Sequence, residues 1–145
     1  MTAASAVGAA LTFVWLGMVL AISFLEAPLK FRAPGVTLQI GLGIGRVVFR
    51  ALNAVEVVLA TAVAVALVSA APPRPAVTSV VIAAVALIVQ LAFVRPLLSR
   101  RSDAVLAAGP EAARLPRSRA HHVYVVLELI KVASLIVAGT VLLAA

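Results

Sequence analysis

Four polar side chains enter the second long apolar stretch of this 145-residue chain. They are Arg46, Arg50, Asn53 and Glu56, and at about 100° of rotation per residue they occupy an arc of roughly 120° on a helix. The residues that follow, 57–71, carry no charge. This pattern predicts a membrane helix with a polar stripe near one end.

A second polar stripe occurs near the C-terminus. It comprises His121, Tyr124, Glu128 and Lys131, which lie within an arc of about 80° by the same arithmetic. Glu56 and Lys131 each lie about 15 Å beyond the start of their stripes, so we expect them at the same depth. A lone charge in mid-bilayer costs at least ~2.5–3.5 kcal/mol. We therefore expect Glu56 to pair with Lys131, and Arg50 to pair with Glu128.

Two facing charged stripes have two interpretations. Ionisable residues inside a membrane are functional by default, which favours a cavity open to the cytoplasm that binds a polar or anionic ligand or passes an ion. Complete charge pairing favours a network that fixes the register between helices. The candidate ligand-binding residues are Arg46, Arg50, Asn53, Glu56, Tyr124, Glu128 and Lys131.

A metal or haem site is a third interpretation, with His121 and Glu128 as candidate ligands. The sequence contains no Glu-x-x-His pair, and the nearby cations repel a metal ion. His121 and His122 are adjacent, so a bis-histidine haem would need a dimer. No serine or threonine stands beside a histidine on these faces for nucleophilic catalysis, and the chain has no cysteine. The sequence implies no particular cofactor and favours a protein that is not an enzyme, with a membrane oxidoreductase as the less favoured alternative.

The composition determines the class of protein. Hydrophobic residues make up 64% of the chain and charged residues 12%, with a mean hydropathy of +1.20. A soluble domain of this length has no room to bury so much apolar side chain, so we expect a polytopic protein in a lipid bilayer. The net charge of +7 comes from arginines clustered between apolar runs, as positive-inside topology requires. We therefore expect no nucleic-acid partner.

The elements that would position the two stripes are four membrane spans in a single domain, residues 1–145. We place the spans at about residues 6–25, 46–69, 76–94 and 122–143. Pro28 should end the first helix, because the residue before a proline avoids the helical region, and Arg95-Pro96 should end the third. The basic segments 26–45 and 95–121 should be cytoplasmic loops, which places both termini outside the cytoplasmic (inner) membrane. Short connections favour an all-α, up-down four-helix bundle.

Two short motifs resemble a known group of proteins. The first span ends in Ala27-Pro28-Leu29-Lys30-Phe31-Arg32, and the second opens with Gly45-Arg46. In these motifs the first third of the chain resembles small bacterial four-span membrane proteins of unknown function that are similar to the eukaryotic transmembrane-protein-205 group. That group is associated with resistance to drugs and metal complexes. The resemblance implies a transport-like role and carries no functional residue over.

The sequence as a whole predicts a membrane protein that binds or transports a small molecule or ion. The alternative is a structural or accessory subunit of a membrane complex. Four short helices are few for a carrier, so we expect a homodimer or a partner in a membrane complex. A homodimer would pack through Gly41 and Gly45 or through alanine faces, since small residues let membrane helices approach closely.

Overall fold

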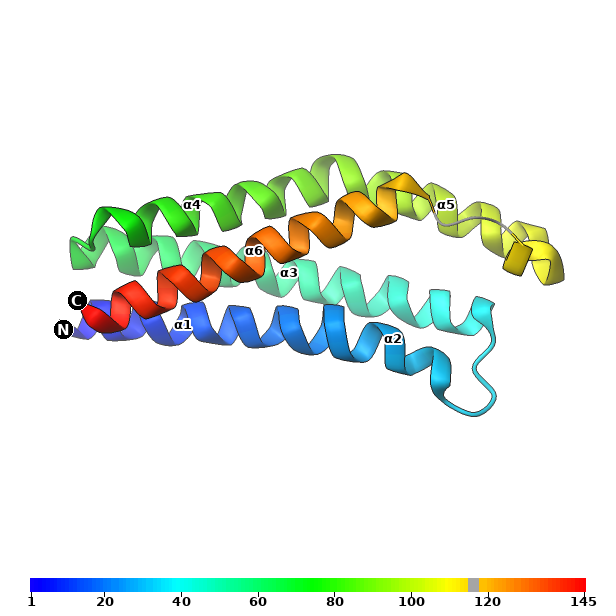
Figure 1. Ribbon diagram of the computed structural model, residues 1–145, viewed down its shortest axis with the longest axis horizontal. Helices are drawn as coiled ribbons and strands as arrows, with labels where there is room; N and C mark the ends of the chain where they lie inside the picture. The colour runs from blue at the N-terminus through cyan, green and yellow to red at the C-terminus, as the bar shows by residue number, and fades with distance from the viewer. Residues whose placement is uncertain (115–117) are drawn as a thin grey trace.

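The computed structural model describes residues 1–114 and 118–145, and almost all of them are helical. Within these residues, four helices are long and apolar enough to cross a membrane: Ala3–Arg32, Leu38–Ala70, Arg74–Glu111 and Arg119–Ala144. Helices that follow one another in the chain run in opposite directions, so both termini lie at the same end of an elongated molecule (Figure 1). The predicted class, all-α with four potential spans, is confirmed to this extent.

Local signals explain where the second helix, α3 (Leu38–Ala70), begins and ends. At its start, the hydroxyl of Thr37 accepts a hydrogen bond from the backbone N–H of Ile40 at 3.2 Å, which satisfies one of the free donors of the first turn. At its end, Ala71 adopts a left-handed conformation with φ 46° and ψ 56°. Pro72 follows, and a proline disfavours the helical region at the residue before it.

The first and third helices continue past the prolines that were expected to end them. α1 (Ala3–Val19) leads through the π-helical segment η1 (Leu20–Glu26) into α2 (Ala27–Leu29) and the 3-10 turn η2 (Lys30–Arg32). α4 (Arg74–Val89) leads through a second π-helical segment, η3 (Gln90–Val94), into α5 (Arg95–Ala108) and the 3-10 turn η4 (Gly109–Arg114). The fourth helix is α6 (Arg119–Ala144).

The π-helical segments explain why the prolines do not break these helices. Just before Pro28, the N–H of Ala27 bonds the carbonyl of Ile22, and just before Pro96, the N–H of Arg95 bonds that of Gln90. Both bonds span five residues. In an α-helix a proline ring clashes with the carbonyl four residues before it, and the wider π-helical turn relieves this clash. The expectation of loops over 26–45 and 95–121 was therefore wrong for most of their length, although residues 115–117 lie outside the described part of the chain.

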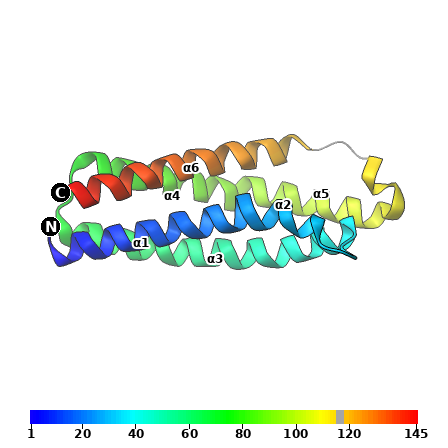
Figure 2. The same ribbon diagram turned by 60° about the horizontal axis from the view of Figure 1, so that its bottom comes forward.

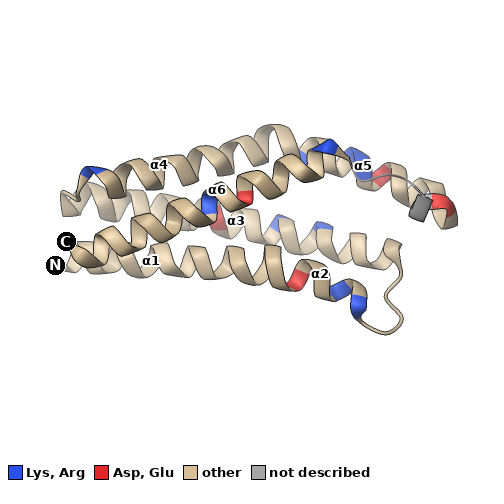
Figure 3. Cartoon of the chain, viewed as in Figure 1, with Lys and Arg blue, Asp and Glu red and all other residues tan. Residues whose placement is uncertain are grey.

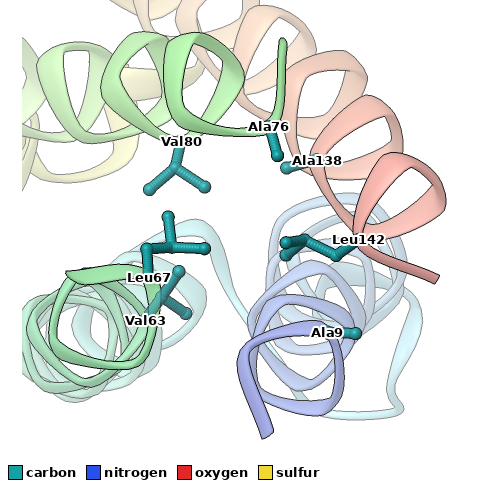
Figure 4. Close-up of a cluster of buried hydrophobic side chains, with 7 residues drawn as sticks. All are labelled: Ala9, Val63, Leu67, Ala76, Val80, Ala138 and Leu142. Atoms are coloured by element: carbon teal, nitrogen blue, oxygen red, sulfur yellow. The ribbon is translucent and has the colours of Figure 1, made fainter. Parts of the chain in front are cut away.

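Side chains pack tightly at the end of the bundle that carries the termini. α6 packs against both α1 and α4, and α1 packs against α3 (Figure 2). Figure 4 shows the apolar cluster that they enclose: Ala9, Val63, Leu67, Ala76, Val80, Ala138 and Leu142. The alanines let the helices approach closely. A second cluster surrounds the buried Trp15 further along the bundle, so this half of the core is mainly apolar.

Candidate functional site

All four helices contribute to a buried polar layer next to the apolar core. Glu56 of α3 accepts hydrogen bonds from Trp15 Nε1 at 2.9 Å and from Lys131 Nζ at 2.5 Å. Lys131 also donates to Glu128 at 3.1 Å, and the Gln90 amide donates to Glu128 at 2.9 Å. None of these five residues is more than 1% exposed. Two carboxylates thus share one ammonium group, and the layer ties the four helices together.

The predicted pairing of Glu56 with Lys131 is confirmed, and that of Arg50 with Glu128 was wrong. Glu128 pairs with Lys131, three residues away on the same helix, whereas the Arg50 side chain is exposed. The reason is rotational. Arg50 precedes Glu56 by six residues, which places it about 120° away around α3 at ~100° per residue. When Glu56 faces the core, Arg50 faces outward.

A pocket of about 490 Å³ lies beside this layer, toward the end of the molecule opposite the termini. Residues of η1, α2, η2, α3, α5 and α6 line it, and most of its surface is apolar. The large apolar side chains in its wall are Phe24, Phe31, Leu42, Phe49, Leu98 and Val125. Its volume is in the usual range of small-molecule sites, about 300–1,000 Å³.

Three cations line the pocket: Lys30, Arg46 and Arg95. They belong to the charged half of the molecule, where most of the coloured residues in Figure 3 gather. Lys30 lies 3.4 Å from Glu26, and Arg46 lies 2.6 Å from Asp103, so both have acidic partners.

Arg95 differs from the other two cations. Within residues 1–114 and 118–145 it has no ion pair, and its guanidinium stacks over the Phe49 ring at 5.8 Å. Lys30 Nζ also lies over Phe49, 5.4 Å from the ring centroid. The rings of Tyr124 and Phe49 form a T-shaped pair, with 5.8 Å between their centroids. Phe49 therefore holds two cations at the wall of a mostly apolar pocket.

Two glycines of α3 make room for the pocket wall. A Cβ on Gly41 would overlap the Phe31 ring, and one on Gly45 would lie 2.9 Å from Lys30 Nζ. Gly43, between them, has nothing within 4 Å of such a Cβ. Gly41 and Gly45 are buried within the chain, so they do not offer the predicted dimer surface.

The predicted ligand-binding residues separate into groups in the structure. Arg46, Tyr124 and Glu128 line the pocket. Glu56 and Lys131 lie behind Glu128 in the buried layer, Asn53 is buried in α3, and Arg50 is exposed.

Sequence reasoning missed two sets of residues. Lys30 and Arg95 were assigned to loops because they adjoin prolines, and Phe49 was treated as part of an apolar run. In the buried layer it missed Trp15 and Gln90 as hydrogen-bond donors. A signal for the last two existed, since Trp15 is the only tryptophan and Gln90 is the only amide in its predicted span.

The proposed metal ligands do not form a metal centre in the described part of the chain. His121 and Glu128 both line the pocket. No group of three or more His, Cys, Asp or Glu side chains that could hold a metal ion occurs among the described residues. Glu128 is instead engaged by Lys131 and Gln90.

Comparisons with protein-family models, with curated proteins and with solved structures gave no match to this chain.

Proposed function

We propose that this chain is a multi-pass membrane protein that binds an anionic small molecule in the basic pocket, as a binding or transport-type protein. The observation that carries the proposal is Arg95, a cation in the pocket wall with no ion pair among the described residues. Ionisable groups within a membrane segment mark ligand sites by default, because an unpaired charge there is costly. An anion would supply the missing partner.

The charges around the pocket favour an anion over a cation. Lys30, Arg46 and Arg95 line it, against a single carboxylate, Glu128. That carboxylate already accepts from Lys131 at 3.1 Å and from Gln90 at 2.9 Å. Lys30 and Arg46 already have acidic partners, Glu26 and Asp103, so the positive charge available to an anion is that of Arg95. Low-dielectric walls strengthen the effect of this charge on a bound anion.

The outward faces of the helices support a position within the bilayer. Large apolar side chains cover them, including Val68 at 88% exposed and Val47 at 69% exposed. A surface this apolar is unstable in water and suits lipid. The basic end would face the cytoplasm by the positive-inside rule, with both termini outside the inner membrane.

A titration of purified protein in detergent with butyl phosphate tests the proposal. We expect saturable binding that falls at least about tenfold in Arg95→Gln, because a hydrogen bond to a charged group is worth ~1.5–3 kcal/mol. Arg50→Gln is the matched control, since it removes an equal charge from an exposed position on α3. Absence of binding, or equal affinity in Arg95→Gln and the unaltered protein, would overturn the proposal.

The buried layer favours a second, structural role. It is enclosed by all four helices, and Lys131 satisfies two carboxylates at once. Such a network can fix helix register without touching a ligand. The alternative, a structural or accessory subunit of a membrane complex, would use the layer alone and would leave the pocket without a ligand.

The homodimer remains a prediction, through a surface other than Gly41 and Gly45. Cross-linking in native membranes would test it by the presence or absence of a dimer band.

A further inference from the structure

The pocket combines two features that a small inorganic anion would not use together. Two of its three cations, Lys30 and Arg95, lie over the Phe49 ring. Most of its remaining surface is apolar, supplied by side chains such as Phe24, Leu98 and Val125. An inorganic phosphate bound at Arg95 would leave this apolar surface uncovered.

We infer that the ligand is an amphipathic anion, with a phosphate-like or carboxylate head at Arg95 and Lys30 and an apolar chain against Val125 and its neighbours. This inference rests on the proposed function and adds the class of ligand. The head meets charge of the opposite sign, and the chain removes apolar wall from contact with water. A volume of about 490 Å³ suits a small single-chain amphiphile, because it lies within the range of sites for small molecules.

The pocket wall that would contact the apolar chain of the ligand offers a matched pair of positions for substitution. Val125 of α6 lines the pocket, whereas its neighbour Val126 is 55% exposed on the outward face of the helix. A phenylalanine at 125 would occupy space needed by the apolar chain of the ligand. The same residue at 126 would add equal apolar surface without entering the pocket.

The experiment compares ethyl, butyl and hexyl phosphate in the unaltered protein, Val125→Phe and Val126→Phe, all in the same detergent. We expect affinity to rise about two- to fourfold for each added methylene, as for a chain that leaves water. Val126→Phe should keep this gain and Val125→Phe should lose most of it. Because partition of the phosphates into micelles is the same in all three proteins, the comparison isolates the contribution of the pocket.

The outcomes separate this inference from the proposed function. If all three phosphates bind with equal affinity, the amphipathic ligand is ruled out while anion binding stands. If the gain persists unchanged in Val125→Phe, the chain does not lie in this pocket and the inference also fails. If none of the three binds, the proposed function fails with it. Should Val125→Phe fold poorly, the chain-length series in the unaltered protein still decides the first question.

Two sources could supply such an amphiphile, and a further arm distinguishes them. The protein is placed in phosphatidylcholine nanodiscs, and hexyl phosphate is titrated with and without added lysophosphatidic acid, which has one acyl chain. Displacement of hexyl phosphate by lysophosphatidic acid would identify a bilayer lipid as the source. Unchanged binding would identify a free single-chain amphiphile, and both results support the shared chemistry.

Discussion

Lys131 is the residue on which the charge balance of the buried layer depends. It contacts Glu56 at 2.5 Å and Glu128 at 3.1 Å, and all three side chains are almost fully buried. Removing either carboxylate leaves one anion with one cation. Removing Lys131 leaves two buried carboxylates with no cation in the layer, which is the costlier state.

We therefore predict that Lys131→Met destabilises the protein far more than Glu56→Gln. Removing one partner of a buried ion pair typically costs about 3–5 kcal/mol, and Lys131→Met should reach or exceed that range. Glu56→Gln should cost less than about 2 kcal/mol, because Lys131 and Glu128 stay balanced. Denaturant unfolding in mixed micelles measures both.

Charge neutralisation gives the control for this prediction. Glu56→Gln combined with Glu128→Gln should recover most of the stability lost in Lys131→Met, whereas Glu56→Gln alone should recover less. Arg50→Met, a loss of an exposed cation, should change stability by less than about 0.5 kcal/mol. Equal losses in Lys131→Met and Glu56→Gln would show that the two carboxylates do not share the ammonium group.

At the residue scale the sequence predicted half of this layer. Equal depth along two helices was enough to pair Glu56 with Lys131. Depth alone failed for Arg50, because pairing also requires the correct rotation, and about 120° separates Arg50 from Glu56. The contact between Glu128 and Lys131 could have been predicted, since residues three apart on a helix are neighbours.

At the scale of elements, the main surprise is the pair of π-helical segments before Pro28 and Pro96. Proline normally ends a helix, so the rule applied to the sequence predicted two loops. A π-helical turn is rare, and no residue pattern in the chain predicted it. Its consequence is that Lys30 and Arg95 lie in helical segments that line the pocket.

The packing of η2 against α3 gives a prediction with an internal control. Gly41→Ala should destabilise the protein relative to Gly43→Ala by at least about 1 kcal/mol, because the new methyl group would overlap the Phe31 ring. Gly43→Ala should be neutral or stabilising, since alanine favours a helix over glycine by up to ~1 kcal/mol. Thermal unfolding of the two variants in one detergent makes the comparison. Equal stability would show that Phe31 does not pack on Gly41.

At the scale of the whole molecule, charge is distributed unevenly along the bundle. Arg74 lies near the end that carries the termini, and most other charged residues lie toward the opposite end (Figure 3). The sequence predicted this asymmetry correctly, because it follows from the order of apolar and basic segments. It also predicted a cavity, but it could not predict most of the residues in the pocket wall, because they come from segments far apart in the chain.

The asymmetry predicts the orientation in the membrane. The chain has no cysteine, so Ala145→Cys and Ala33→Cys each introduce a single thiol, one at each end of the molecule. In intact spheroplasts, a membrane-impermeant maleimide should label Ala145→Cys but not Ala33→Cys, and permeabilisation should expose the second. The opposite labelling pattern would place the termini in the cytoplasm and the pocket end outside.

We propose that an anionic molecule occupies the pocket, and native mass spectrometry of protein purified from membranes in a mild detergent would detect it. We predict an added mass of an anionic amphiphile on the unaltered protein and on Arg50→Gln, and its loss in Arg95→Gln. A protein that carries no added mass, or one that keeps the same mass in Arg95→Gln, would contradict the claim and would favour a purely structural role for the buried charges.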